Sequence, residues 1–191
     1  MKKPSWAFIA FCLAMPISST TTVQMLPSKS PQAMMSLDFL IGGWKGNGWR
    51  FRVNGPRTGI SKTRIVKSES NGSILRLKET ERQNKIDQDS PWPTSATVVV
   101  YYDDAAKLYR GRMEEEEGTL SGQPIVIMKE QPLLVTLINS QTLQLDMHVA
   151  TVIVRTTITV TKSGEWHETS QRWNSTDGWT KVQEAVLKRV K

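Results

Sequence analysis

Residues 151–174, TVIVRTTITVTKSGEWHETSQRWN, hold the pattern that decides the fold. Apolar or small side chains occupy the even positions from Val152 to Val160, and threonine or arginine occupies most of the odd positions. Such alternation is typical of a β-strand with one buried face and one wet face. Ser163-Gly164 then supplies a tight turn before a second run of strand-forming residues. The stretch therefore predicts an antiparallel hairpin.

Similar runs of Val, Ile, Thr and aromatic residues continue from Trp44 to the end of the chain, with turn signals about every ten residues. Asn71-Gly72 and Asp177-Gly178 indicate two further tight hairpins, because such pairs readily adopt positive φ angles. Strands are predicted near residues 44–53, 57–70, 73–82, 94–102, 107–116, 123–129, 132–138, 142–148, 151–161, 165–174 and 179–190.

A sheet of about ten sequential antiparallel strands has two exposed edges unless it closes on itself, and closure removes both. We therefore expect an all-β protein: a single antiparallel up-and-down β-barrel of about ten strands. The strand count exceeds what a filled eight-stranded barrel needs, which favours an internal cavity. Ahead of the strands, the apolar pattern of residues 32–41 predicts one short helix that ends at Gly42-Gly43.

The N-terminus has the pattern of a signal peptide, in which Lys2 and Lys3 precede an apolar run from Trp6 to Met15. This run is too short to cross a bilayer, so no transmembrane segment is expected. The predicted division is a signal peptide at 1–20, a flexible leader at 21–33 and a barrel domain at 34–191. We expect export to the periplasm or the cell exterior. Cys12 is the only cysteine, so loss of the signal would exclude disulfides and thiolate chemistry.

The formal net charge is +7, and basic residues concentrate near the start of the barrel. The stretch from Phe39 to Ser68 has no acidic residue. Its basic residues are Lys45, Arg50, Arg52, Arg57, Lys62, Arg64 and Lys67. One interpretation places them on the solvated outer faces of neighbouring strands, and the other is attraction to an anionic surface or ligand.

The run from Leu37 to Trp49, LDFLIGGWKGNGW, resembles the opening strand of calycin-type barrels. Lipocalins begin this strand with Gly-x-Trp, and nitrobindin-like barrels extend it to Gly-x-Trp-x-Gly-x-Gly. Over residues 37–190 the chain is similar to a bacterial family of small exported lipocalin-like or fatty-acid-binding-protein-like barrels without an agreed activity. Other resembling segments are Tyr101-Tyr102-Asp103, Tyr109-Arg110-Gly111-Arg112, Trp166-His167-Glu168, Asp177-Gly178-Trp179 and Leu187-Lys188-Arg189-Val190. The resemblance implies a calycin-like barrel.

Five residues in these segments have predicted structural roles. Gly42 opens the motif, Trp44 would close one end of the barrel, and Gly46 and Gly48 would permit a sharp bend. Arg189 is expected to stack on the Trp44 indole, with its guanidinium within about 6 Å of the ring. Nitrobindin-like barrels bind haem iron through a histidine on the last strand. This chain has Val182-Gln183 there, so no cofactor is expected.

Candidate ligand-binding residues follow from strand parity. Trp49 and Phe51 share a face opposite to Arg50, and we expect that face to point inward. Arg110 and Arg112 also share a face. Pointed inward they would hold a carboxylate ligand, and the alternative is that they face water or pair with Glu79, Glu81 or Glu168. Glu168 itself is a further pocket candidate, although periodicity does not decide whether Glu168 or its neighbour His167 faces inward.

Sequence motifs for serine hydrolases, phosphate loops and zinc proteases are absent. Asp146 and His148 could ligate a metal, but their strand parity predicts that they face solvent. Export argues against a nucleic-acid partner. The predicted function is therefore a non-catalytic barrel that binds a small hydrophobic or amphipathic molecule. Two alternatives stay open: an envelope-associated module that docks its basic face on an anionic surface, and an acid–base enzyme that uses Glu168 or Glu184.

Overall fold

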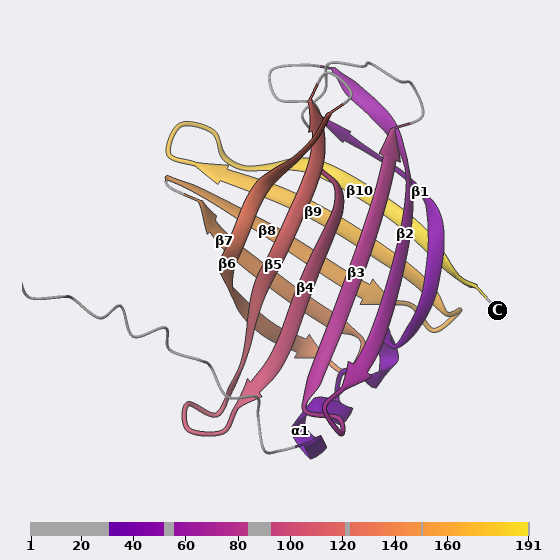
Figure 1. Cartoon of the computed structure of the whole chain (residues 1–191), viewed down its shortest axis with the longest axis vertical. Coiled ribbons are helices and arrows are strands. Elements are labelled where there is room, and N and C mark those ends of the chain that lie inside the picture. Colours follow the sequence, from indigo (N-terminus) through magenta and orange to yellow (C-terminus); the bar gives the residue numbers. More distant parts are fainter. Residues whose placement is uncertain (1–30, 52–55, 84–92, 121–122, 150, 191) are drawn as a thin grey trace, which may run out of the picture.

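The computed structural model describes residues 31–51, 56–83, 93–120, 123–149 and 151–190, which form a closed antiparallel barrel after a short helix (Figure 1). The elements are α1 (Pro31–Met35), the 3-10 turn η1 (Asp38–Leu40), β1 (Gly42–Phe51), β2 (Arg57–Glu69), β3 (Ile74–Gln83), β4 (Pro93–Asp103), β5 (Leu108–Leu120), β6 (Gln123–Asn139), β7 (Thr142–Val149), β8 (Val152–Val160), β9 (Glu165–Asn174) and β10 (Gly178–Val190). Every strand pairs with its sequence neighbours, and β1 also pairs with β10. The predicted fold class is confirmed. The expected signal peptide and the leader up to residue 30 lie outside the described residues.

The three hairpins predicted from turn pairs are all present. Gly72, Gly164 and Gly178 have φ angles of 84°, 80° and 66° at the β2–β3, β8–β9 and β9–β10 connections. These angles lie in the left-handed region, where glycine has no Cβ to clash. Short-range turn chemistry therefore fixes these connections from the sequence alone.

Two details of the predicted secondary structure were wrong. The runs at 123–129 and 132–138 are one continuous strand, β6, because both halves stay paired to β5 across Glu130, whose φ is 46°. The single helix expected over residues 32–41 is instead two short pieces, α1 and η1. No helix in the described part of the chain is long and apolar enough to cross a membrane.

The α1–η1 segment covers one end of the barrel (Figure 1). Leu37 and Leu40 are fully buried in the main apolar cluster, and the Tyr109 hydroxyl donates a hydrogen bond to the Ala33 carbonyl at 2.7 Å. Trp44 of β1 belongs to the same cluster, and its indole N–H donates a hydrogen bond to the Leu40 carbonyl at 2.9 Å. This end, called the helix end below, is packed. The other end, where β1 finishes at Phe51 and β9 at Asn174, is called the far end.

Closure of the barrel depends on two glycines of β1. A Cβ on Gly46 would lie 2.0 Å from the Val186 carbonyl oxygen of β10, and one on Gly48 would lie 2.2 Å from the Glu184 carbonyl oxygen. No side chain fits at such distances, so β1 can approach β10 only with glycine at both positions. The glycines predicted to permit a bend therefore lie at the seam between the first and last strands.

Truncating the helix-end core should destabilise the barrel strongly. Leu40→Ala removes a fully buried side chain, and we expect it to lower the free energy of unfolding by about 2–5 kcal/mol. Ile138→Ala, at a side chain that is 54% exposed on β6, should change it by less than about 1 kcal/mol. Urea denaturation followed by tryptophan fluorescence measures both. Equal losses in the two variants would contradict the packing of η1 into the barrel.

Candidate functional site

The inner faces of β1, β2 and β3 carry charged side chains. On β2 the even positions from Thr58 to Val66 are buried, and they alternate with exposed or half-buried odd positions. Lys62 and Arg64 thereby point into the barrel between Ile60 and Val66. Arg50 of β1 and Glu81 of β3 are also on the inner side and form an ion pair at 2.5 Å. Part of the basic stretch is thus buried.

Glu168 of β9 lies at the centre of this charged group and is 2% exposed. Lys62 Nζ donates to its Oε1 at 2.7 Å, and Arg64 Nη1 donates to its Oε2 at 2.5 Å. Gln183 Nε2 adds a bond of 3.0 Å from β10, and the Trp166 indole N–H adds one of 3.3 Å. Four donors from three strands therefore surround one carboxylate.

Glu79 and Glu81 of β3 complete what we call the ion cluster: Arg50, Lys62, Arg64, Glu79, Glu81 and Glu168. Lys62 Nζ lies 2.9 Å from Glu79 Oε1 and 3.6 Å from Glu81 Oε2, and Arg64 also pairs with Glu79. Three cations thus meet three carboxylates, so the cluster is neutral when all are ionised. Arg64 Cζ lies 4.9 Å from the Trp166 ring centroid, and Arg64 Nε is buried without a hydrogen-bond partner among the described residues.

Small residues make room for the cluster. Lys62 on β2 is paired in register with Gly46 on β1, and Glu168 on β9 is paired with Ala185 on β10, which itself pairs with Gly48. These three small residues separate β2 from β9 along the inner surface. Long side chains from β2 can therefore reach over β1 and β10 to Glu168. The glycines that allow closure also clear the path for the ion pairs.

The cluster keeps Glu168 ionised. Burial alone would raise the pKa of Glu168, but the charges of Arg64 and Lys62 and the hydrogen bonds from Lys62 and Trp166 outweigh it and lower the pKa to about 2. Burial also lowers the pKa of the Lys62 ammonium from its usual value, against the opposing pull of Glu168 and Glu81. Because Glu168 holds no proton near neutral pH, it is not suited to act as a general acid.

The opposite wall of the interior is apolar. Val98 and Met113, which pair between β4 and β5, face inward, as do Met147 and Val154, which pair between β7 and β8. All four side chains are only half-buried, although they point into the barrel. Leu77 and Leu133, which pair with Val98 and Met147 and lie on the same inner face, are buried. The interior therefore has a charged wall on β1–β3, β9 and β10 and a partly accessible apolar wall on β4–β8.

The predicted inward positions of Trp49 and Phe51 were wrong. The inner set of β1 is the even one, which contains Trp44 and Arg50, so both aromatic residues face outward and Phe51 is 42% exposed. The error came from treating arginine as an outward residue. Arg50 is instead stabilised inside by Glu81, and a paired charge can be buried at acceptable cost.

Arg110 and Arg112 also lie outside the barrel, so the predicted carboxylate site is not formed. Arg110 Nε lies 3.4 Å from Asp103 Oδ2, and Arg112 Nη2 lies 3.1 Å from Glu114 Oε1. The residue between them, Gly111, faces inward, where a Cβ would lie 2.9 Å from Val135 Cγ2. The alternative that these arginines face outward is therefore correct, with different acidic partners.

The Trp44–Arg189 contact is present. Arg189 Cζ lies 4.4 Å from the Trp44 ring centroid, and its guanidinium donates to the carbonyls of Ile41 and Phe39 at 2.7 and 3.3 Å. Gly42 has a φ of 137°, and the position of a Cβ there would be 3.0 Å from Arg189 Nη1. These contacts hold the first and last strands to η1. Trp44 also packs on Trp166, with ring centroids 5.2 Å apart.

Other candidate residues lie outside the interior. Asp146 faces outward and binds Arg155 through two bonds of 2.9 Å, and His148 on the same face is exposed. Glu184 accepts a hydrogen bond from the Trp49 indole on the outer surface. Among the described residues no group of three His, Cys, Asp or Glu side chains is placed to hold a metal ion.

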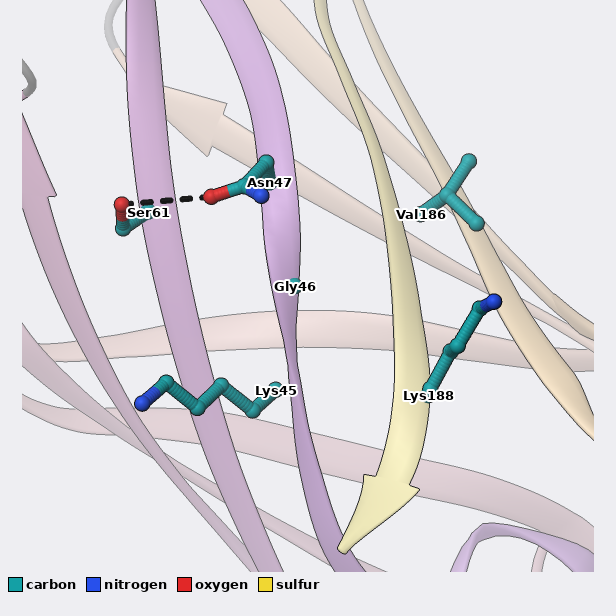
Figure 2. Close-up of a pocket in the computed structure, with 6 residues that line it drawn as sticks. All are labelled: Lys45, Gly46, Asn47, Ser61, Val186 and Lys188. Carbon is teal, nitrogen blue, oxygen red and sulfur yellow. Dashed lines mark hydrogen bonds between the residues drawn. The ribbon is translucent and has the colours of Figure 1, made fainter.

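A groove of about 520 Å³ lies on the outer face of the seam between β1 and β10 (Figure 2). Lys45 and Lys188 extend beside Gly46, and Ser61 donates a hydrogen bond to Asn47 at 3.2 Å. Lys188 is 3.7 Å from Glu165. The groove is open and lies on the outer surface, whereas the buried charged residues described above converge inside the barrel. We therefore place the candidate site in the interior.

Known structures resemble the fold of this chain. A crystal structure of Rv2717c from M. tuberculosis is 13% identical with a TM-score of 0.54, covering 87% of this chain and 100% of that chain. The S-type phycobiliprotein lyase CPES from Guillardia theta is 8% identical with a TM-score of 0.54, covering 83% and 93%. No protein-family model and no curated protein matches the sequence. These likenesses support the calycin-like barrel fold and assign no site residue.

Sequence reasoning found Glu168 but missed its partners Lys62 and Arg64, and it missed Glu79 and Glu81, which pair with those two cations. A signal for them exists in the sequence. Lys62 and Arg64 have the parity of Ile60 and Val66, while the intervening positions are mostly Gly, Ser and Thr. Basic residues on the apolar side of one strand and acidic residues on the apolar side of the next would together have indicated a buried ion cluster.

Glu168 should make the fold sensitive to acid. Its folded pKa of about 2 is below the ordinary value of 4.5, so its stabilisation is complete above pH 4.5 and is lost as the pH falls toward 2. Glu168→Gln should remove that part of the pH profile and cost about 3–5 kcal/mol at neutral pH, because Lys62 and Arg64 lose a buried partner. Urea denaturation from pH 2 to 7 measures both effects. The control Glu165→Gln changes a carboxylate on the outer face of the same strand, and this variant should still lose stability as the pH falls from 4.5 to 2. A control variant whose stability no longer depended on pH in this range would contradict the assignment of that dependence to Glu168.

Proposed function

We propose that this protein is an exported, non-catalytic binding barrel for a small amphipathic molecule with an anionic head and an apolar tail. The observation that carries the proposal is the two-sided interior. Charged residues line one wall, and half-buried Val98, Met113, Met147 and Val154 line the other. Apolar side chains that face inward yet remain accessible favour an apolar ligand portion, because covering them removes that surface from water.

The far end is the proposed entrance. The helix end is filled by Leu37, Leu40, Trp44 and Trp166, which are all fully buried. The inward-facing residues Met147 and Val154 lie near the strand ends at the far end and keep part of their surface accessible. A ligand that entered there would meet the apolar wall and the ion cluster side by side.

The charge of the inner face favours an anionic head. The ion cluster is balanced, with Arg50, Lys62 and Arg64 against three glutamates. Arg172 adds one further cation: its register partner is Val154, so it starts on the inner face near the far end, and it is exposed without an ion pair to any described residue. A free arginine at the entrance is suited to a carboxylate, sulfonate or phosphate.

The chemistry of the two candidate carboxylates favours binding over acid–base catalysis. Glu168 has a pKa of about 2 and is surrounded by donors, which makes it a structural anion. Glu184 lies on the outer surface beside Trp49, away from the interior. Neither side chain is placed as a proton donor facing the apolar wall.

Filling the apolar wall should block binding. A suitable probe is 11-(dansylamino)undecanoate, a carboxylate with a fluorescent apolar tail, and we expect saturable binding at one site per chain. Val98→Trp adds bulk to the accessible inner wall and should weaken binding by about tenfold or more. Ile138→Trp, on an exposed outer position, should leave affinity unchanged. Fluorescence titration measures affinity, and circular dichroism checks folding. Failure of the wild-type chain to bind this probe, or equal binding by Val98→Trp, would overturn the proposal.

The head-group preference has a separate test. Arg172→Gln should weaken binding of the carboxylate probe by about three- to tenfold, because it removes one charge-assisted contact. The matched control Arg82→Gln removes an exposed arginine from the outer face of β3 and should have no effect. A cationic dansyl alkylamine should bind more weakly than the carboxylate to the wild-type chain. Stronger binding of the amine would contradict the anionic head.

A further inference from the structure

The outer surface at the far end carries an aromatic and basic patch that the interior does not use. We call it the rim patch and define it as Trp49, Phe51, Arg57, Arg155, Trp173, Trp179 and Lys181. Register joins its members: Phe51 pairs with Arg57 between β1 and β2, and Trp179 pairs with Trp173 between β10 and β9. Trp49 donates to Glu184 of β10 at 3.2 Å, and Lys181 lies 3.5 Å from the same carboxylate oxygen, so Glu184 links the two halves of the patch across the seam.

We propose that the rim patch docks the protein on the surface of an anionic lipid bilayer, with the far end of the barrel turned toward the lipids. This proposal rests on the proposed function in one respect, since it gives the entrance of the barrel a lipid-facing position. The patch itself stands on its own observations.

Two aromatic residues of the patch, Phe51 and Trp179, are exposed, and the other two, Trp49 and Trp173, are half-buried. Phe51 is 42% exposed and Trp179 is 39% exposed, and the rings of Trp49 and Phe51 pack edge to face at 5.5 Å. Large aromatic side chains on an outer strand surface are costly in water unless something covers them. Tryptophan is also favoured at the boundary between lipid headgroups and acyl chains, because its ring is apolar and its N–H is polar.

Arginines accompany both aromatic groups. Arg57 Cζ lies 4.0 Å from the Trp49 ring centroid, and Arg155 Cζ lies 4.4 Å from the Trp179 centroid. Arg155 and Lys181 have acidic partners, Asp146 and Glu184, whereas Arg57 forms no ion pair with any described residue. Arg172 at the neighbouring entrance adds a second unpaired cation, again among the described residues. The surface is therefore net positive beside exposed aromatic rings.

This charge favours a lipid surface over a second copy of the chain. A symmetric dimer through the patch would bring Arg57 and its own copy into the same interface, and like charges there are destabilising. Anionic headgroups instead offer many negative partners to unpaired arginines and accept the aromatic rings between them. Two features of one surface thus point to the same occupant.

Vesicle binding tests the proposal. Wild-type protein is mixed with vesicles of phosphatidylcholine containing 30% phosphatidylglycerol, and the bound fraction is measured by flotation. We expect binding that weakens in pure phosphatidylcholine and at high salt, and a blue shift of tryptophan fluorescence. The double variant Phe51→Ser/Trp179→Ser should bind about tenfold more weakly. The control Leu134→Ser/Ile138→Ser removes two exposed apolar side chains of β6 and should bind like the wild type.

Several outcomes would overturn the docking proposal. These are no vesicle binding by the folded wild-type chain, equal binding by both double variants, and a wild-type dimer that the Phe51→Ser/Trp179→Ser variant converts to a monomer. Thermal unfolding by circular dichroism shows whether each variant folds. Titration of each variant with 11-(dansylamino)undecanoate, without vesicles, separates the two proposals. A rim variant that keeps probe affinity but loses vesicle binding supports the patch, and vesicle binding without probe affinity would leave docking intact while the proposed ligand site fails.

Discussion

The ion cluster around Glu168 is the constraint on which the rest of the interior depends. Glu168 lies on β9, and its charged partners Lys62 and Arg64 lie on β2, with the two seam strands between them. A buried ion pair contributes little net stability compared with apolar packing, but removing one member leaves an uncompensated charge. We therefore expect the cluster to act mainly on the register of β2. A one-residue slip of β2 would move both cations to the outer face and leave Glu168 buried without them.

The cluster also lies between two regions of the interior that differ in packing. Toward the helix end the core is apolar and filled, with Trp44, Trp166 and Leu40 fully buried. Toward the far end the same strands present charges on one side and half-buried apolar residues on the other. The filled core and the proposed ligand entrance thereby lie at different ends of one barrel. Arg189 reinforces this division, because its stacking on Trp44 and its bonds to Ile41 and Phe39 hold the helix end closed.

Much of the fold could be predicted from local chemistry, and the facing of individual strands could not. Gly72, Gly164 and Gly178 mark hairpins through backbone angles that few other residues adopt, so sequence alone is sufficient there. The contact between Arg189 and Trp44 could be predicted from the resemblance of the Gly42–Trp49 motif to calycin-type barrels. By contrast, Trp49 and Arg50 are neighbours on one strand and therefore face opposite sides of the sheet. Hydrophobicity predicted that Trp49 faces inward, whereas Arg50 does. The cost of burying Arg50 is offset by Glu81, 31 positions away in sequence, and no local pattern contains that pairing.

The fold of this barrel is shared with other proteins, but its charge distribution depends on particular side chains. Structures 13% and 8% identical share its architecture, and that likeness assigns none of the ion pairs that line its interior. A basic stretch that suggests an anionic partner in fact places Lys62 and Arg64 against internal glutamates, where they are neutralised. Only cations without an internal partner can recruit an external anion. Arg172 on the inner face and Arg57 on the outer face meet that condition among the described residues, and both lie near the far end. The balanced cluster therefore adds no net charge to the interior, and at the far end Arg172 and Arg57 supply the positive charge that the proposed ligand and the proposed lipid surface would each contact.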